Sequence, residues 1–527
     1  MSAAVTPQTE PDLEHPILSP EGNLGATMSR FGEWANPILM KELRRSLKSR
    51  QFLISFSLVL LTCWLISVAG TLTNANLIEF SPTSSLFFMS YYTIIAIVTM
   101  LVIPYSLHRS LTDEQDSKSF ELLSITTLAP NQIVWGQLLA AMLQMFVYFS
   151  AVTPFMAFTS LLQGFDALRF GVLLIVLLFA CVLVTMASVS ISCLPSQHSG
   201  KGVLSVMVLA VLGGSFSLLM TVMGAVISGQ IDLDQYFWIG LGLFAVYAIS
   251  FFFLFQQIAA SQLTFEADNR SSGIRIVVTA QLLVMAGSIF LLARLVSSFS
   301  NVITEMMILF LMTCSYLTVS ALFFALESDH ISRRVLRDMP GNLFVRLLTT
   351  PWQPGGSRGM MFYLVHLILI SAIYYGLTLS YPGTTAKQYS ITIASVLYSL
   401  ILVCFGALFS RGIQALSPEL KPVHARTMLT FVVIIIILIP HVILFFNGFY
   451  DQPGERFSYW LILNPFATIS LMMAGTQTPY LIELLCVIAG LFLLANLPTM
   501  FLCIRQSWHS NKALKNSEGK GHVVKLS

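Results

Sequence analysis

The feature that most constrains this chain is a series of long segments that contain no Asp, Glu, Lys or Arg. A bilayer core is about 30 Å thick, so a helix that crosses it needs roughly 20 apolar residues. Only 10% of the 527 residues are charged, against about 25% in an ordinary soluble domain. This composition excludes a soluble enzyme, a disordered regulator and a nucleic-acid binder. Thirteen charge-free runs are long enough to span: 51–78, 80–108, 122–165, 170–200, 202–231, 235–265, 276–293, 306–326, 359–386, 388–410, 427–450, 457–482 and 484–504.

We expect the spans to be α-helices and the fold to be all-α. Backbone groups in lipid must be satisfied by a helix or by a closed barrel. Barrel strands are about 10 residues long and alternate polar with apolar residues. The run FVVIIIILI at 431–439 does not alternate, so helices are favoured.

One run differs from the others, because Asn464-Pro465 lies in its middle. Proline removes a helix donor and clashes with the preceding turn, and a broken helix at membrane depth needs protein or a cavity to cover it. We therefore predict a re-entrant or interfacial element at 457–475, followed by a last span from about residue 479. This leaves about 12 spans in two regions, 53–260 and 261–505.

The distribution of basic residues predicts the orientation. With the N-terminus inside, 24 of the 28 Lys and Arg residues fall on the cytoplasmic side. The four exceptions are Arg169, Arg294, Lys387 and Arg456. We therefore predict a multi-pass protein of the cell (plasma or inner) membrane with both termini cytoplasmic. Residues 1–28, acidic and without Lys or Arg, are expected to be a disordered tail, and residues 506–527 a second, loose tail.

Few residues suggest chemistry within this chain. The seven cysteines form no C-x-x-C pair and are expected to pack inside spans. There is no phosphate-binding loop and no nucleophile elbow, so we expect no catalytic residue, cofactor or metal. His366 and His441 are intramembrane and so are functional candidates, although His441 follows Pro440 and is equally suited to capping carbonyls freed by a kink. Residues 326–360, rich in Pro and Gly, are predicted to be a linker with one short helix.

The first informative cytoplasmic segment is 29–52, which is predicted to hold an amphipathic helix. At about 100° per residue, its apolar and basic side chains separate onto opposite faces. Asn36 is a suitable N-cap and Pro37 suits the first turn. We expect this helix to lie along the inner leaflet with its basic face toward lipid headgroups; a generic basic anchor is the alternative. The basic residues are Lys41, Arg44, Arg45 and Lys48.

The second informative segment is the loop 109–130 between spans 2 and 3. It opens acidic, with Asp113, Glu114 and Asp116, and then becomes apolar, with Phe120 and Leu122-Leu123. A short amphipathic element held between two spans suits docking on a soluble partner. The alternative is a tight loop whose apolar residues enter the membrane interface.

These two segments, at 36–50 and 114–141, resemble the permease subunits of ATP-binding-cassette transporters of the type-2, export-type family. Those permeases have an amphipathic elbow helix, then a loop patterned E-R-E-x-G-T-x-E-x-L-x-x-x-P and a helix that opens with Gly-Lys-Leu. Asn464-Pro465 also resembles the outer re-entrant element of that family. This chain departs from the pattern at Lys118, Ser119 and Gln137, and in having twelve spans where six are usual. The comparable positions here are Glu114, Asp116, Ser119, Glu121, Leu123, Pro130 and Gly136-Gln137-Leu138.

The resemblance implies that the chain forms a membrane path while a separate ATPase subunit binds ATP-Mg. The loop between spans 2 and 3 would be the coupling element on which that ATPase docks. The implied partners are the ATPase, the lipid bilayer and, if one copy does not form the path alone, a second permease copy. The coupling residues would be Glu114, Asp116, Ser119, Phe120, Glu121, Leu122 and Leu123.

Two other functions compete with this interpretation. An ion-coupled secondary transporter predicts similarity between the two halves and an intramembrane carboxylate, and neither is clear in the sequence. A non-transporting membrane anchor or assembly protein would keep the amphipathic helix and the docking loop but would support no substrate-stimulated ATP hydrolysis.

Overall fold

The structure is a computed structural model of the whole chain. It describes residues 37–73, 83–116, 129–194, 200–265, 268–295, 302–337, 339–379, 385–417, 422–446, 459–474 and 480–518. These residues contain helices and turns and no β-strand. The prediction of an all-α fold is confirmed.

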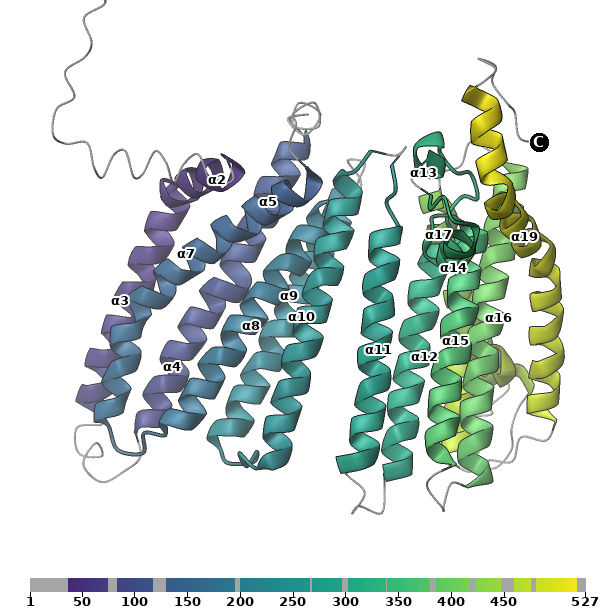
Figure 1. Cartoon of the computed structure of the whole chain (residues 1–527). Helices are drawn as coiled ribbons and strands as arrows, with labels where there is room; N and C mark the ends of the chain where they lie inside the picture. Colours follow the sequence, from purple (N-terminus) through teal and green to yellow (C-terminus); the bar gives the residue numbers. More distant parts are fainter. Residues whose placement is uncertain are drawn as a thin grey trace, which may run out of the picture. The chain divides into compact units, whose positions relative to one another are not determined.

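Twelve helices or helix pairs among the described residues are long and apolar enough to cross a membrane. Their exposed side chains include many large apolar groups, such as Leu53, Ile54 and Leu58 on the first span, which suits contact with lipid. The prediction of a polytopic membrane protein with twelve spans is confirmed. The spans are α3 (Arg50–Thr73), α4 (Ser84–Ala96) continued by α5 (Ile103–Asp116), α7 (Pro130–Phe158), α8 (Ala167–Ser192), α9 (Gly200–Ile227), α10 (Gln235–Leu263), α11 (Ser272–Leu295), α12 (Val302–Ala325), α15 (Gly356–Thr378), α16 (Ala386–Leu416), α17 (Pro422–Phe446) and α19 (Leu481–Glu518) (Figure 1).

The remaining helices are short. The run with Asn464-Pro465 forms a 3-10 turn at Tyr459–Leu463 and then α18 (Pro465–Ala474), a helix of 10 residues. At 1.5 Å per residue α18 is about 15 Å long, half of what a span needs, so counting twelve spans was correct. The other short elements are α2 (Pro37–Leu47), α13 (Arg333–Arg337), α14 (Leu343–Thr349) and 3-10 turns at Thr159–Leu161 and Thr350–Trp352.

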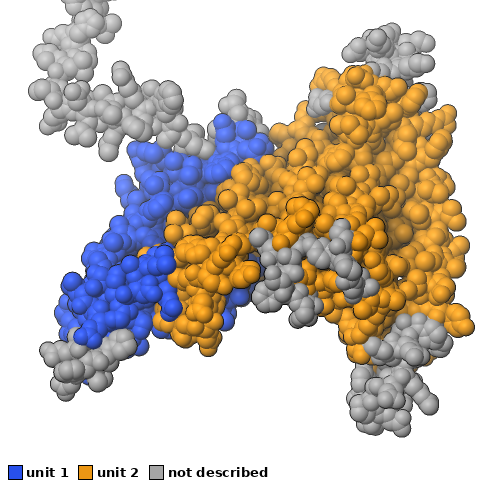
Figure 2. All heavy atoms as spheres, turned by 60° about the horizontal axis from the view of Figure 1, so that its bottom comes forward, with its two compact units in different colours: residues 1–171, 209–223 blue, residues 172–208, 224–527 orange. Residues whose placement is uncertain are grey.

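The chain forms two compact units, which are coloured separately in Figure 2. Unit 1 comprises residues 1–171 and 209–223, and unit 2 comprises residues 172–208 and 224–527. The division near residue 260 that the sequence suggested stays a prediction.

In unit 1, span 2 is one continuous helix with a π-helical segment at Ile97–Val102 between α4 and α5. Pro104 follows this segment and cannot donate a backbone hydrogen bond, and its ring crowds the carbonyl four residues earlier. Widening the helix by one residue relieves that clash. Aromatic side chains fill the interior of this unit, with Tyr91 and Phe87 almost fully buried.

The core of unit 2 lies among α11, α12, α15, α16 and α19. Phe310 stacks on Tyr374 with ring centroids 4.2 Å apart, and Leu317 and Tyr363 are fully buried beside them. Helices α12 and α15 approach closely at Gly359, where a Cβ atom would lie 2.5 Å from the backbone of Phe324. Small residues at a crossing let two membrane helices pack backbone against backbone.

Two expectations for the aqueous segments were wrong. The segment predicted as a linker is tightly packed over residues 350–360, where Pro351, Ser357 and Arg358 are buried, and two short helices precede it. A loose tail was also predicted after Ser507, but α19 continues as a helix to Glu518.

Candidate coupling site on the first unit

Helix α2 is shorter than the segment predicted for it. It begins at Pro37, which needs no amide hydrogen bond in a first turn, and ends at Leu47. Lys48 lies in a turn, Ser49 separates the two helices, and α3 begins at Arg50. Ile38 and Glu42 form the buried side of α2, which packs against α7. Asn36, the predicted cap, lies outside the described residues.

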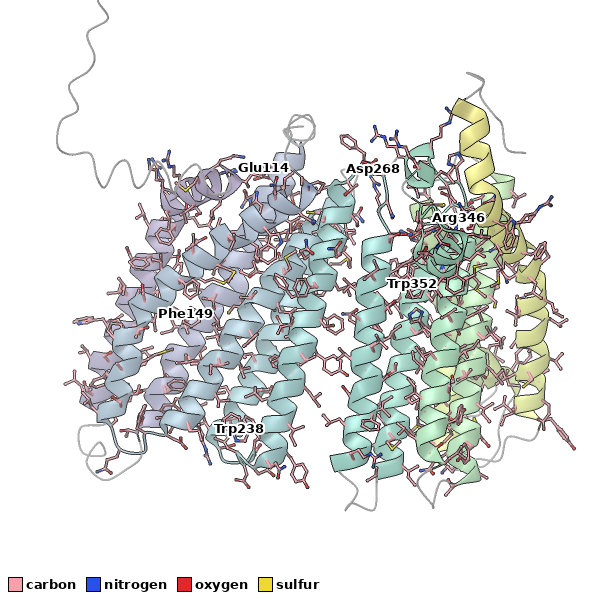
Figure 3. The ribbon with its side chains drawn as sticks, in the orientation of Figure 1. Glu114, Phe149, Trp238, Asp268, Arg346 and Trp352 are labelled. Carbon is pink, nitrogen blue, oxygen red and sulfur yellow. The ribbon has the colours of Figure 1, made fainter. Side chains whose placement is uncertain are left out.

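Glu114 joins α5 to the basic face of α2. Its carboxylate accepts a hydrogen bond from Lys41 Nζ at 2.9 Å and from Arg45 Nη1 at 3.3 Å. The Glu114 side chain is 9% exposed, whereas those of Lys41 and Arg45 are about half exposed. Two of the basic residues predicted to face lipid headgroups therefore engage the end of span 2 instead, while Arg44 and Lys48 stay exposed. Figure 3 shows Glu114 at the end of α5 nearest α2.

A second carboxylate, Glu42, lies in the same cluster, 3.4 Å from Lys41 Nζ. Burial raises the pKa of Glu42 above its ordinary value, and the neighbouring charge of Glu114 raises it further. Burial alone would lower the pKa of Lys41, but the hydrogen bond and charge of Glu114, with those of Glu42, raise it overall. The site is therefore an acid–base cluster in which Lys41 holds its proton firmly.

The structure describes only part of the predicted coupling loop. Asp116 is the last residue of α5, and its side chain is not described. The predicted contact residues Ser119, Phe120, Glu121, Leu122 and Leu123 lie outside the described residues. The chain is described again from Ala129, which precedes α7, and the Gln132 side chain accepts from the Ala129 amide at 3.0 Å. Gln132 thus caps the first turn of α7.

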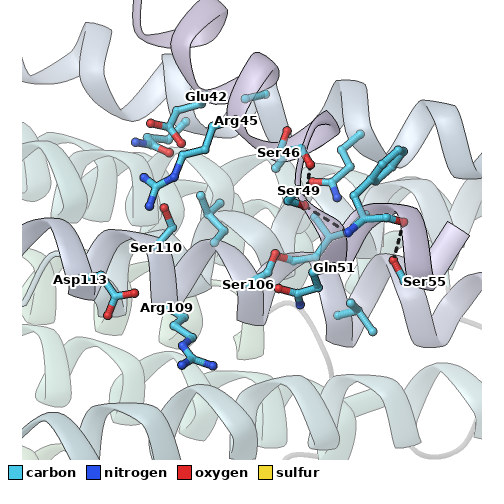
Figure 4. Close-up of a pocket in the computed structure, with 18 residues that line it drawn as sticks. Glu42, Arg45, Ser46, Ser49, Gln51, Ser55, Ser106, Arg109, Ser110 and Asp113 are labelled. Carbon is cyan, nitrogen blue, oxygen red and sulfur yellow. Dashed lines mark hydrogen bonds between the residues drawn. The ribbon is translucent and has the colours of Figure 1, made fainter.

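A polar pocket of about 270 Å³ lies between α2, α3, α5 and α7. Figure 4 shows Arg45 reaching from α2 toward Ser110, with Arg109 and Asp113 on the same helix α5. This pocket was not predicted from the sequence. Its signal was a set of small or polar residues repeating every three or four positions on α7: Gln137, Ala140, Ala141 and Gln144.

Asn464-Pro465, the predicted re-entrant element, links α18 to α17. The side-chain Oδ1 of Asn464 accepts from the backbone amides of Phe466 and Ala467 at 3.0 and 3.1 Å, which caps α18. Its side-chain nitrogen Nδ2 lies 3.0 Å from His441 Nε2 and donates to the Ile437 carbonyl at 3.3 Å. His441 on α17 is therefore within hydrogen-bonding distance of the Asn464 side chain.

His366, the other intramembrane candidate, is held inside unit 2. Its Nδ1 lies 2.7 Å from the Phe362 carbonyl and its Nε2 lies 3.1 Å from Thr279 Oγ1. The Trp352 indole donates to the same hydroxyl at 2.8 Å. Both ring nitrogens of His366 therefore have a partner inside the protein, as expected for a histidine with a structural role. All seven cysteines are free, and only Cys486 is exposed; the described residues hold no cluster of potential metal ligands.

A buried ion-pair cluster in unit 2 was not predicted from the sequence. Arg275 is fully buried, donates to the carbonyl oxygens of Pro351 and Gly355, and pairs with Glu327 at 2.7 Å. Arg358, also buried, donates to Ser507 on α19. The cluster ties the segment after α14 to α11 and α19; Figure 3 shows Arg346 and Trp352 in this region.

Comparisons with family models, curated proteins and solved structures give no significant match to this chain. The resemblance to type-2 permeases therefore rests on the residues quoted above.

Proposed function

We propose that this chain is the membrane-spanning permease subunit of an ATP-binding-cassette transporter that works as an exporter. A separate ATPase subunit would bind ATP-Mg and dock on the cytoplasmic loop between α5 and α7. The chain itself would carry no catalytic site. Its place would be the plasma or inner membrane, with both termini cytoplasmic.

The observation that best supports this proposal is the pairing of Glu114 with Lys41 and Arg45. Glu114 lies three residues before the segment 117–128, on which the ATPase would act. A force that the ATPase exerts on that segment would be transmitted directly to α5, and to α2 through the ion pairs. Helix α2 packs on α7 and leads through Ser49 into α3. Three spans would then move together when the ATPase closes, as a two-state element requires.

The docking contact would be formed mainly by Phe120, Leu122 and Leu123, with Glu121 pairing with a basic ATPase residue. Apolar anchors near the centre of an interface usually carry most of the binding energy. Charged residues at the rim contribute mainly to register and to the rate of association.

The test is to isolate the chain from its native membranes together with any bound ATPase. Phe120→Asp and Glu121→Arg should abolish retention of the ATPase. Glu114→Gln should leave the ATPase bound but should reduce the effect of the permease on ATP hydrolysis, because the link to α2 is weakened. Phe165→Asp is the matched control: Phe165 is 41% exposed and lies in the turn between α7 and α8, at the other end of α7. Equal loss in all variants, or no loss in any, would reject the docking assignment.

A further inference from the structure

The polar pocket of unit 1 lies at one membrane boundary. It is lined by the first turns of α3, by the last four turns of α5 and by the part of α7 that begins at Gln137. Gln137 is seven residues beyond the start of α7, which is about 10 Å at 1.5 Å per residue. All three spans therefore present polar groups at a depth where phospholipid headgroups meet the acyl region.

The lining of this pocket is polar and balanced in charge. It includes two guanidinium groups, Arg45 and Arg109, and two carboxylates, Glu42 and Asp113. Serine hydroxyls at 106 and 110 and the amide of Gln144 add donors and acceptors. Polar groups at this depth are costly unless they are paired, so the lining favours an occupant that carries both signs of charge.

Some of this hydrogen-bonding capacity is not used within the described part of the chain. The Gln137 side chain is 3% exposed, and its carbonyl oxygen accepts no hydrogen bond there. The buried carboxylate of Glu42, by contrast, already pairs with Lys41 at 3.4 Å. A buried acceptor without a donor loses the hydrogen bonds that water would give it, so a ligand that donates hydrogen bonds would be stabilised here.

The volume of the pocket and the residues around it limit which kind of ligand can bind there. A volume of about 270 Å³ is below the roughly 300–1,000 Å³ of pockets for drug-sized ligands, so it suits a headgroup-sized group. On α3, the exposed Leu58 lies three residues after Ser55 and seven after Gln51, both of which line the pocket, so it is on the same face of the helix. An acyl chain has a surface to follow directly beside the pocket, which favours a lipid over a soluble phosphate ester.

We propose that this pocket binds the headgroup of a zwitterionic phospholipid that carries a primary amine. The phosphate would lie against Arg45 and Arg109, and the ammonium group would donate to Glu42, Asp113 and the Gln137 carbonyl. Arg45 would serve both this phosphate and Glu114, since a guanidinium has five donors. The site would fix α2 to the first spans in a lipid-dependent way, whether or not an ATPase is bound.

The experiment is to titrate the purified full chain, delipidated in detergent, with defined lipids and to detect bound lipid by native mass spectrometry. Phosphatidylethanolamine should bind more tightly than phosphatidylcholine, whose quaternary amine donates no hydrogen bond, and more tightly than phosphatidylglycerol, which has no amine. A parallel titration with free phosphoethanolamine distinguishes a site for a lipid from a site for a soluble ligand with the same headgroup. No ATPase is present, so this result is independent of the proposed permease function.

Three variants test the contacts. Arg109→Gln should weaken phosphatidylethanolamine binding by about tenfold, the loss expected for one charge-assisted hydrogen bond. Asp113→Asn should remove the preference for phosphatidylethanolamine over phosphatidylglycerol. Ala140→Leu should block binding by filling the pocket. Arg169→Gln is the control, because Arg169 pairs with Asp166 at 3.3 Å and does not line the pocket. Thermal unfolding of each variant verifies that it is folded.

The proposal would be overturned if the three variants bound lipid as the wild type does. That result would mean that the pocket holds water and not a lipid headgroup. It would also be overturned if phosphatidylglycerol bound equally well, or if free phosphoethanolamine competed at the same affinity as the lipid. Preferential binding of phosphatidylethanolamine that Arg109→Gln and Ala140→Leu both reduce would support it.

Discussion

Arg275 illustrates how single residues hold unit 2 together. Its guanidinium is fully buried and reaches backbone carbonyls on the segment after α14 as well as Glu327. A planar group with five donors in a fixed fork can serve several acceptors at once. The carbonyls that it satisfies belong to a Pro- and Gly-rich segment that makes few backbone hydrogen bonds of its own. Arg275 thereby helps to fix this segment, together with the hydrogen bonds of Trp352 to Thr279 and of the Gly355 amide to Glu327.

We predict that Arg275→Lys destabilises the protein although it conserves the charge. A lysine ammonium is a point charge that cannot match this fork, and each lost hydrogen bond from a charged donor to a backbone carbonyl costs about 1.5–3 kcal/mol. The measurement is the unfolding temperature in detergent. Arg294→Lys is the matched control, because Arg294 is exposed near the other end of the same helix. A similar unfolding temperature for both variants would contradict the role given to Arg275.

Glu42 gives a prediction with a defined dependence on pH. Its pKa is raised, mainly by burial and further by Glu114, so the folded protein binds this proton more tightly than the unfolded chain does. Stability contributed by that proton is present below the ordinary pKa of 4.5 and is lost as the pH rises through the folded pKa. Glu42→Gln should therefore raise the unfolding temperature at pH 7.

The gain from Glu42→Gln should shrink as the pH falls through the raised pKa of folded Glu42 and should be gone below the ordinary pKa, where Glu42 is protonated in both the folded and the unfolded wild type. Glu305→Gln, at an exposed carboxylate in the first turn of α12, should change little at either pH. If Glu42→Gln lowered the unfolding temperature at pH 7, the pair with Lys41 would outweigh the burial.

At the scale of helices, the sequence predicts the elements better than their contacts. Runs without charge predict the spans because the thickness of the bilayer sets their length, and Asn464-Pro465 marked the one run that does not span. The ion pairs between Glu114 and α2 depend on how three spans pack, and periodicity within one segment carries no information about that packing. The Pro and Gly residues of 326–360 predict a linker, but these residues also occur where backbones approach closely, as they do in the packed part at 350–360.

Close approach of α12 and α15 gives a prediction at this scale. In Gly359→Ala, the added Cβ would lie 2.5 Å from the backbone of Phe324, so the helices must separate. We expect a loss of about 1–3 kcal/mol, as for other overpacked sites. In Gly376→Ala, on the same helix, the Cβ meets nothing within 4 Å, and the higher helix propensity of alanine should stabilise by up to about 1 kcal/mol. Equal unfolding temperatures for the two variants would contradict the close contact.

For the whole molecule, the proposed function requires that the loop between α5 and α7 lies in the cytoplasm. The distribution of 24 of the 28 basic residues predicts this orientation. The orientation decides between the permease proposal and any function that would use the loop outside the cell, and it can be tested without knowing the substrate.

We predict opposite labelling of two introduced cysteines in a Cys486→Ser background, which removes the exposed native thiol. Gln230→Cys, in the turn between α9 and α10, should react with a membrane-impermeant maleimide in intact cells. His330→Cys, exposed after α12, should react only after permeabilisation. The reverse pattern would place the loop outside and would reject the ATPase proposal.

Docking of a separate ATPase between α5 and α7 can be detected with a photo-crosslinking residue at Leu122 in native membranes. We expect one major adduct whose partner contains a G-x-x-x-x-G-K-[ST] phosphate loop, and which is lost in the Phe120→Asp background but kept in Phe165→Asp. An adduct to lipid alone, or to a protein without a phosphate loop, would contradict this docking.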